Sequence, residues 1–358
     1  MKIIFITRKF PPSIGGMERY SYEISSRITK KYETLIIALK KSQLFLPLFF
    51  PYAIIKAVLN KKKEKTVVHI SDALLSPVGI IIKKLTGFPV ILTVHGLDVT
   101  FPNYLYQKII PFFMKKYDKI VCVSNETLKE CVKRGLSEEK CVVIPNGINI
   151  KKKDKTDKKI LKEILKNKLE KGPIILSVGR LTKRKGFHWF LSETVPKLVK
   201  KEKNLCYLIV GKGKMQKQIN AIIKTKRLEK NVFSLGEVKD DVLENLFSCS
   251  DLFVMPNIKV EGDVEGFGIV AIEAASYGLP VVASDLEGIK DAVKEGKNGI
   301  LVEPENSSEY YETIIKLLNN REKREKIGKN AKQYTEKNYD WNNIITKYEK
   351  IYNNLIGE

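Results

Sequence analysis

Residues 265–275 read Glu-Gly-Phe-Gly-Ile-Val-Ala-Ile-Glu-Ala-Ala, with a carboxylate at each end of a glycine-rich turn and an apolar run. Gly266 and Gly268 allow a tight backbone turn and the close approach of a ligand. The apolar run predicts a helix, whose first N–H groups and positive dipole end favour a phosphate. Glu265 precedes this helix and Glu273 lies inside it, so one can accept from sugar hydroxyls and the other from a ribose diol. The pattern predicts a sugar-nucleotide site, although two glutamates alone also fit an ordinary helix with an acidic N-terminus.

Short apolar runs that end at glycine, proline or polar residues alternate with helical patterns along the chain. This alternation is typical of α/β folds with parallel sheets. Strands are expected at residues 2–6, 90–94, 174–179, 207–213, 232–238, 251–257 and 280–284.

The length of the chain predicts two lobes. Its 358 residues exceed the roughly 100–200 that one domain usually organises. A short strand at residues 143–148 is stopped by Pro-Asn-Gly, a turn signal that indicates the boundary. Beyond it, residues 151–171 carry ten lysines against four acidic residues. We expect a solvated linker there, with a lysine-rich helix at residues 158–170.

The pattern at residues 265–275 resembles the signature of the retaining glycosyltransferase family 4, and the resemblance covers nearly the whole chain. It implies a GT-B fold, in which two Rossmann-like, doubly wound lobes face a central cleft. Residues 1–150 would form the acceptor-side lobe, and residues 151–338 the lobe that binds the nucleotide sugar. The final helices, at about 339–358, would pack back on the first lobe.

Two first-lobe segments extend the resemblance, Phe-Pro-Pro-x-x-Gly-Gly at residues 10–16 and His-Gly-x-Asp at residues 95–98. They are most similar to lipid-directed mannosyltransferases. The resemblance therefore implies transfer of a hexose from a nucleoside diphosphate sugar to an acceptor hydroxyl with retention, the leaving phosphate helping to deprotonate the acceptor. GDP-mannose is the first expected donor, and UDP-sugars follow closely.

The first lobe contributes two glycines and a histidine to the predicted site. Gly15 and Gly16 stand between a strand and a helix, where a backbone approaches phosphate in dinucleotide folds, but such a pair also fits a plain turn. His95 follows the strand expected at 90–94, at the end where ligands bind open α/β sheets; a lone histidine is also often structural. The resemblance implies that the glycines border the diphosphate and acceptor and that His95 positions the transferred sugar, with Asp98 on the same loop.

The second lobe supplies positive charge. Arg180 and Lys185 follow the strand expected at 174–179, and preorganised cations stabilise a departing diphosphate in a site shielded from water. A solvated basic loop is the alternative. The resemblance implies that both residues contact the phosphates and that the base is read by backbone groups near Val238. The predicted substrate site also includes Gly213, Phe267, Gly268, Ile269 and Glu273.

No metal or cofactor is expected. Asp263-Val264-Glu265 is an acid-x-acid triplet of the sort that metal-dependent transferases use, but Glu265 is already assigned to the sugar. The five cysteines are an odd, widely spaced set without metal-ligand spacing, which favours a reduced cytosolic protein. The N-terminal residues do not read as a signal peptide.

The apolar stretch at residues 44–59 has a composition that bears on membrane binding. Leu44–Leu59 is strongly apolar but shorter than the ~20 residues of a membrane span, and Lys61, Lys62 and Lys63 follow it. An apolar, aromatic face beside lysines suits the surface of an anionic membrane, and Tyr104–Lys119 repeats the composition. Packing of both apolar faces into the first lobe explains the pattern equally well.

A net charge of +23 favours polyanions without naming one. Nucleic-acid binding is disfavoured because acidic residues interleave the lysines and no reading module is recognisable. Two other GT-B classes stay open as alternatives. A nucleotide-sugar epimerase would release free sugar with water, and a phosphorylase would need a pyridoxal-bearing lysine, for which no motif stands out.

Overall fold

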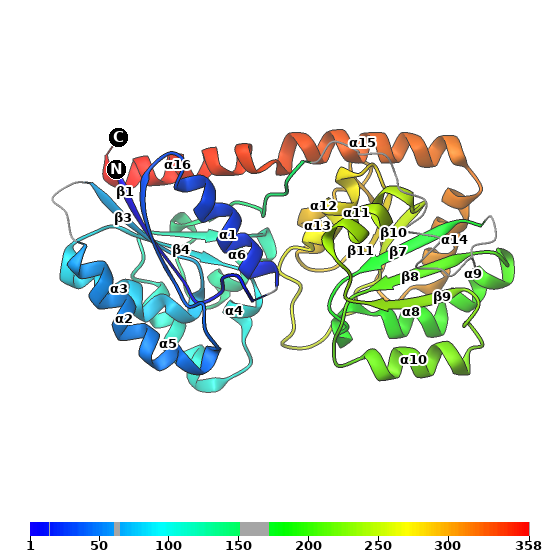
Figure 1. Cartoon of the computed structure of the whole chain (residues 1–358), viewed down its shortest axis with the longest axis horizontal. Coiled ribbons are helices and arrows are strands. Elements are labelled where there is room, and N and C mark those ends of the chain that lie inside the picture. The colour runs from blue at the N-terminus through cyan, green and yellow to red at the C-terminus, as the bar shows by residue number, and fades with distance from the viewer. Residues whose placement is uncertain (14, 61–64, 151–171, 358) are drawn as a thin grey trace. The chain divides into compact units, whose positions relative to one another are not determined.

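The computed structural model describes residues 1–13, 15–60, 65–150 and 172–357. It divides the chain into two compact units, each described here by itself (Figure 1). Unit 1 contains Met1–Gly147, Gly262–Phe267 and Tyr339–Glu358, and unit 2 contains Ile148–Glu261 and Gly268–Asn338. The predicted linker at 151–171, its helix, and the lysines at 61–63 lie outside the described residues.

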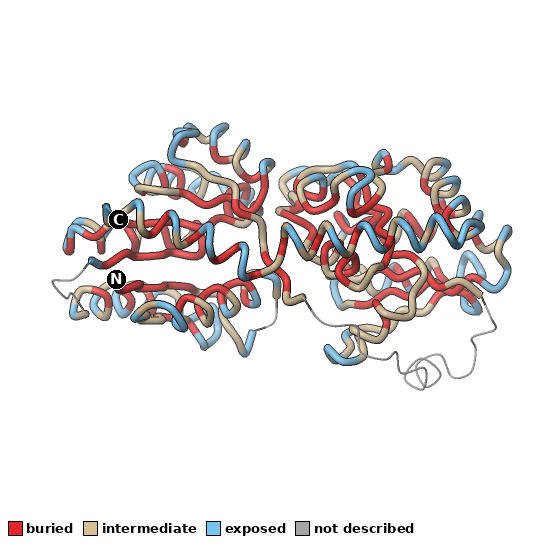
Figure 2. The backbone as a smooth tube through the Cα atoms, turned by 90° about the horizontal axis from the view of Figure 1, so that it is seen from above, coloured by how far each residue is buried: buried red, intermediate tan, exposed pale blue. Residues whose placement is uncertain are grey.

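Unit 1 is built on a six-stranded parallel sheet in the order β2-β1-β3-β4-β5-β6. Its strands are β1 (Lys2–Thr7), β2 (Glu33–Ala38), β3 (Thr66–Ile70), β4 (Val90–Val94), β5 (Lys119–Cys122) and β6 (Cys141–Val143). The inner strands are buried on both faces (Figure 2), which explains the largely apolar runs of β1 and β4. The buried strand β3, which contains Thr66 and His69, was not among the expected strands. The strand expected at 143–148 ends instead at Val143, two residues before Pro145, which has no N–H for a sheet bond.

Each face of this sheet has its own core. Alternate strand residues such as Ile4 and Ile6 point to the layer formed by α2 (Leu46–Leu59), α3 (Ser76–Thr86) and α5 (Tyr104–Met114). Their neighbours Ile3 and Phe5 point to α1 (Gly16–Ile28) and α16 (Trp341–Ile356). The shorter helices of unit 1 are η1 (Gln43–Phe45), η2 (Ala73–Leu75), α4 (Leu97–Thr100), α6 (Asn125–Lys133) and η3 (Glu138–Lys140).

The last helix is part of unit 1. Trp341 at its start is buried against Gly147, where an added Cβ would lie 2.5 Å from the indole ring. The guanidinium of Arg27 on α1 lies 5.3 Å from the centre of the same ring. Tyr348 and Tyr352 of α16 are fully buried against the sheet. The C-terminal helix therefore completes the core on one side of the first sheet.

Unit 2 repeats the plan with the order β12-β11-β10-β7-β8-β9, again parallel. Its strands are β7 (Ile174–Val178), β8 (Cys206–Val210), β9 (Val232–Gly236), β10 (Leu252–Met255), β11 (Val281–Ser284) and β12 (Ile300–Val302). One face is covered by α8 (Phe187–Glu193), α9 (Val195–Lys201), α10 (Gln216–Thr225) and α14 (Ser307–Leu318). The other is covered by α11 (Asp240–Cys249), α12 (Ile269–Ser276), α13 (Ile289–Ala292) and α15 (Arg321–Tyr339).

Both sheets are doubly wound, as the sequence predicts. In unit 1 the chain moves from β1 outward to β2 and then crosses to β3 on the other side of β1. In unit 2 it moves from β7 through β8 to β9 and then crosses to β10. Ligands of such sheets bind at the carboxyl ends of the strands, where the strand order reverses. The switch points of the two sheets are therefore at the loops after β1 and β3 and at those after β7 and β10.

Candidate active site

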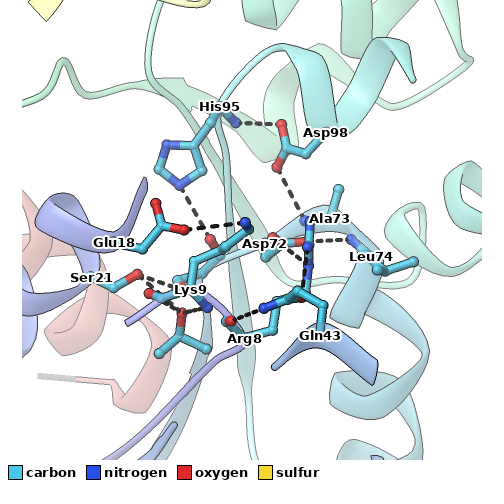
Figure 3. Close-up of polar contacts among 12 residues, drawn as sticks. Arg8, Lys9, Glu18, Ser21, Gln43, Asp72, Ala73, Leu74, His95 and Asp98 are labelled. Carbon is cyan, nitrogen blue, oxygen red and sulfur yellow. Dashed lines mark hydrogen bonds and ion pairs between the residues drawn. The ribbon is translucent and has the colours of Figure 1, made fainter. Parts of the chain in front are cut away.

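Charged side chains gather at the carboxyl edge of the first sheet, beside its switch point (Figure 3). Arg8 and Lys9 follow β1, Asp72 follows β3, and His95 follows β4. Because these strands are parallel and adjacent, their ends meet at one edge. This edge brings His95 together with ionisable residues that the sequence did not single out.

The orientation of His95 is fixed by three contacts. Its Nε2 lies 3.2 Å from the carbonyl oxygen of Ser71, and because a carbonyl only accepts, Nε2–H is the donor. Its backbone N–H donates to Oδ1 of Asp98 at 2.7 Å. The ring stands edge-on to Tyr20, with centroids 4.7 Å apart. These contacts fix the direction of the imidazole at the sheet edge.

Asp98, which the sequence assigns to substrate binding, is buried and contacts backbone groups of its own unit. Its second oxygen accepts from the N–H of Ala73 at 3.2 Å. Burial raises the pKa of this carboxyl and the charge of Asp72 adds to the rise, while His95 and the two N–H donors oppose it. The carboxyl thus ties the His95 loop to η2, the turn that follows β3.

We expect Asp98→Asn to lower the free energy of unfolding by about 1–3 kcal/mol, because one of two buried N–H groups loses its acceptor. Urea unfolding measures this loss. A variant of normal stability with a raised Michaelis constant would instead favour direct substrate binding by Asp98.

Two ion pairs flank His95 and were missed from the sequence. Nε of Arg8 lies 2.9 Å from Asp72, whose carboxyl is fully buried. Lys9 lies 3.1 Å from Glu18, in the first turn of α1. Their position in the sequence could have identified them as site residues, because Arg8 and Lys9 come directly after a buried strand that ends at a switch point.

Glu18 also explains one of the two predicted glycines. A Cβ added at Gly15 would lie 2.3 Å from a carboxylate oxygen of Glu18, so any side chain at that position would displace the carboxylate. At Gly16, the first residue of α1, an added Cβ would meet no atom within 4 Å. Open space therefore lies over Gly16 and not over Gly15.

A buried polar network lies beneath His95. Tyr20 bonds Thr93 at 3.1 Å and Tyr348 of α16 at 2.7 Å. His69, on β3, bonds the same threonine at 2.8 Å and Tyr352 of α16 at 2.7 Å. Burial lowers the pKa of His69 from 6.5 to about 3, and the charge of His95 adds to this, so His69 is neutral. The network joins the last helix to the sheet under the site.

The segment that carries Glu265 packs against the His95 loop and is grouped with unit 1. A Cβ added at Gly266 would lie 2.0 Å from the carbonyl oxygen of His95. Gly96 has a φ of +100°, and its own Cβ would lie 2.9 Å from the Cα of Gly266. Only two facing glycines allow this approach. The buried Glu265 and His95 thus belong to the same unit.

The residue after Gly266 anchors the same segment. Phe267 is buried, and its ring centroid lies 5.9 Å from that of Tyr339, just before α16. Gly262, at the other end of the segment, lies near Pro102, which follows α4. The loop is therefore held at both ends and in the middle by unit 1.

In unit 2, Lys185 ends the turn η4 (Lys183–Lys185), which follows β7. Its side chain is only 7% exposed, and its Cε lies 3.3 Å from where a Cβ at Gly179 would be. The fully solvated loop considered from sequence is therefore wrong for Lys185, whereas Arg180 is exposed.

Contacts across the switch point hold this turn. Gly186 has a φ of +67°, and its Cβ would lie 1.8 Å from the carbonyl oxygen of Pro256, so no larger residue fits there. The N–H of Ile258 donates to the carbonyl of Arg184 at 2.9 Å. The loops after β7 and β10 are thus fixed to each other.

The helix predicted after the glycine turn is α12, and it begins at Ile269. Gly268 stands before it with a φ of +79°, a conformation that favours glycine. The first N–H groups of α12 lie at the carboxyl edge of the sheet, and Glu273 is half-buried in its second turn. Unit 2 therefore presents a helix N-terminus at the same edge as Arg180 and Lys185.

The other residues that were predicted to bind the nucleotide-sugar donor, Gly213 and Val238, lie on neighbouring loops of unit 2. The loop after β8 packs on the loop after β7, because a Cβ at Gly213 would lie 2.4 Å from the carbonyl oxygen of Leu181. Val238, after β9, packs partly buried against the core. Within the described ranges, no three His, Cys, Asp or Glu side chains gather as a metal site would require.

Comparison with known proteins agrees with this architecture. The family model described as glycosyl transferases group 1 matches residues 158–334, and the one described as glycosyltransferase family 4 matches residues 14–152. The uncharacterized glycosyltransferase MJ1178 of Methanocaldococcus jannaschii is 30% identical over 287 residues, which cover 78% of this chain and 72% of that protein.

Two further matches span nearly the whole chain. The GPI3 subunit of phosphatidylinositol N-acetylglucosaminyltransferase from Saccharomyces cerevisiae is 24% identical over 381 residues, 97% of this chain and 81% of that protein. The crystal structure of Anabaena HepE in complex with UDP matches with a TM-score of 0.80 at 19% identity, covering 98% of this chain and 99% of that one. The GT-B fold expected from the sequence is thereby confirmed.

Proposed function

This chain belongs to the glycosyltransferases, and from that premise we propose that it moves a hexose from a nucleoside diphosphate sugar to an acceptor hydroxyl. The observation that carries this proposal is the switch point of unit 2, where the buried Lys185 and the N-terminus of α12 meet one sheet edge. A cation and a helix N-terminus are the groups that bind a diphosphate. The presence of UDP in the structural neighbour HepE supports the same class of donor.

Six of the predicted residues have roles in this proposal. Arg180, Lys185 and the first N–H groups of α12 bind the diphosphate. Glu273 accepts hydrogen bonds from the ribose, and backbone groups around Val238 contact the base. Glu265 and His95 hold the transferred sugar. We propose that neither a metal nor a cofactor takes part, because cations and a helix end already supply the positive charge.

The proposed reaction retains the anomeric configuration. The bond from the anomeric carbon to the leaving phosphate oxygen breaks while the acceptor oxygen bonds to the same face of that carbon. The acceptor proton passes to the leaving phosphate, so the charges balance without another base. Negative charge grows on the diphosphate as its bond stretches, and Lys185 stabilises it in the transition state.

The acceptor proposed is a lipid-linked molecule, and the enzyme would work at the cytoplasmic side of a membrane. The sequence likeness to lipid-directed mannosyltransferases supports this, as does the match to a phosphatidylinositol-modifying relative. In the described ranges, no helix has both the length and the apolar character of a membrane span. GDP-mannose is the first donor to test, and UDP-sugars are the second.

The division of labour between the two glutamates can be measured. Glu273→Ala should weaken binding of the nucleoside diphosphate by roughly 1.5–3 kcal/mol, because a charge-assisted hydrogen bond to ribose is lost. Glu265→Ala should leave that affinity nearly unchanged and lower turnover, because it contacts the sugar. Calorimetry with the nucleoside diphosphate alone tests both. Equal losses of affinity would contradict the assignment.

A donor screen that follows nucleoside diphosphate release, with and without acceptor, tests the reaction class. Transfer requires a glycosylated acceptor among the products. Free sugar released with water in the absence of acceptor would instead indicate the epimerase alternative.

A further inference from the structure

The outer surface of α2, α3 and α5 exposes large apolar side chains. The three helices lie side by side on one face of the first sheet (Figure 1). We call this surface the apolar face, and it consists of Leu44, Phe45, Leu48, Tyr52, Ile55, Leu59, Ile81, Leu85, Tyr104, Leu105, Ile109 and Phe112. A large exposed apolar patch usually marks an interaction site.

The helix α2 is apolar on two opposite sides. Phe49, Ala53 and Ala57 face the core, as expected for one stripe of a surface helix. On the outward stripe, Leu48 is 69% exposed and Leu59 is 79% exposed. A helix that is apolar all round is normally covered on every side. The inward stripe accounts for folding, so the outward stripe needs another explanation.

The exposed charges around this face are positive. Of the acidic residues described between residues 40 and 118, Asp72 and Asp98 are buried, and Asp118, which follows α5, is half-buried and paired with Lys83 of α3 at 2.6 Å. The exposed ionisable side chains on and beside the three helices are instead lysines, namely Lys40, Lys41, Lys84, Lys108, Lys115 and Lys116. An apolar surface bordered by exposed cations, whose one neighbouring carboxylate is already paired with a lysine, is complementary to anionic lipid headgroups.

Several of these lysines pair with aromatic rings. The ammonium of Lys116 lies 3.8 Å from the ring centre of Phe112, and that of Lys41 lies 5.3 Å from that of Phe45. Lys56 donates to the hydroxyl of Tyr52 at 2.9 Å. Aromatic and lysine side chains with an apolar body and a polar tip suit the headgroup level of a bilayer. Protein interfaces, by contrast, are depleted of lysine.

The apolar face is continuous with the candidate active site. Gln43 of η1 accepts from the guanidinium of Arg8 at 3.2 Å and donates to the Arg8 carbonyl at 2.9 Å, and the exposed Leu44 follows it. At the other end, the hydroxyl of Tyr106 on α5 donates to the carbonyl of Asp98, in the His95 loop. A lipid lying on this face would thus have its headgroup beside the Arg8–His95 edge.

We propose that the apolar face docks on an anionic lipid membrane and presents lipid-linked acceptors to the edge that carries Arg8 and His95. The inference rests on the proposed function for the role of the acceptor, but the docking itself does not depend on it. The apolar side chains enter the interface, and the lysines contact the anionic headgroups.

Vesicle co-sedimentation of the full chain tests this proposal. The probes are vesicles of phosphatidylcholine alone and of phosphatidylcholine with phosphatidylglycerol. The charge variant replaces Lys84, Lys108 and Lys116 with glutamine, and the apolar variant replaces Leu48, Ile55 and Leu59 with serine. All six positions are outside the proposed catalytic residues. The matched control replaces Lys217, Lys224 and Lys226 with glutamine, three exposed lysines on or next to α10 in unit 2.

The wild type should bind the anionic vesicles and lose binding as salt rises. The charge variant should bind roughly a hundredfold more weakly, since each lysine near an anionic surface contributes about fivefold. The apolar variant should bind at least tenfold more weakly, and the α10 control should stay within about fivefold of the wild type. Circular dichroism and calorimetry with the nucleoside diphosphate verify that every variant is folded.

Three results would overturn the proposal. The first is vesicle binding by the charge and apolar variants that is as tight as that of the wild type. The second is a loss of vesicle binding in the α10 control as large as that in the charge variant, which would mean diffuse attraction without a docking surface. The third is a dimer in light scattering that the apolar variant converts to monomers, because the face would then belong to a second copy. Docking in a protein that transfers no sugar would refute the proposed function alone, and transfer to soluble acceptors without docking would refute the docking alone.

Discussion

Lys185→Ala is expected to lower the turnover number for sugar transfer by about a hundredfold or more, with a much smaller change in the Michaelis constant of the donor. The buried ammonium at the switch point of unit 2 would stabilise charge that develops on the diphosphate only as the glycosidic bond breaks. Steady-state kinetics of nucleoside diphosphate release measures the effect, and Arg180→Ala should act in the same direction.

The same turn supplies the control. Lys183 carries the same charge two residues away on η4, but its side chain is exposed. Lys183→Ala should therefore keep nearly normal turnover. If both lysine variants lose activity equally, or if Lys185→Ala is nearly normal, the transition-state role of Lys185 is wrong.

The second large effect is on stability in acid. Burial lowers the pKa of His69 from 6.5 to about 3, so the unfolded chain takes up a proton near pH 6.5 and the folded chain does not until near pH 3. Proton uptake by the unfolded state means that this contribution to stability is complete above pH 6.5 and falls as the pH decreases toward 3. Between pH 7.5 and pH 4 the wild type should lose roughly 3 kcal/mol more than a His69→Gln variant.

Urea unfolding at several pH values tests this difference. The chain has two tryptophans, Trp189 in unit 2 and Trp341 in unit 1. In a Trp189→Phe background, the fluorescence of Trp341 reports on the unit that contains His69. Carboxylates titrate in both proteins and cancel in the comparison, and glutamine keeps a donor and an acceptor for Thr93 and Tyr352. Parallel pH curves for the two proteins would contradict the prediction.

The parallel α/β architecture was predictable because buried parallel strands leave a strong trace in sequence, and its doubly wound order was implied by the family resemblance. β4 and β7 read as apolar runs with one hydroxyl residue each, Thr93 and Ser177, and they stop at polar or glycine-containing loops. The edge strand β2 was not recognised, because its outer position leaves Glu33 exposed and most of its residues half-buried. The inner strands β3 and β5 were also not expected, because Thr66 and His69 interrupt the apolar run of β3 and β5 is only four residues long and begins with a lysine. A strand buried on one side only lacks the continuous apolar pattern.

The site was predictable where position along a strand carries the information, and not where distant contacts decide. His95 and Lys185 follow the carboxyl ends of β4 and β7, which the sequence indicates. The packing of Gly266 against the His95 loop depends on Gly96 and Gly266, which are far apart in the sequence. A glycine has no side chain whose chemistry could indicate which residue packs against it. Likewise, the sequence presents Asp98 as a carboxylate that can bind substrate. Only the fold reveals that the backbone N–H groups of His95 and Ala73 donate to it.

The return of α16 to unit 1 affects how the protein is made. Ile3, Phe5 and Val67 on the first strands are covered by Trp341 and the tyrosines of the last helix. A ribosome adds about 5–20 residues per second, so roughly 10–40 s pass between the emergence of the first sheet and that of its cover. During that interval the nascent chain carries an open apolar surface, the kind that chaperones bind and that leads to aggregation. Fast expression should therefore lower the yield of folded protein. A C-terminal fusion tag, which is attached to the helix that covers the first sheet, should lower this yield more than an N-terminal tag does.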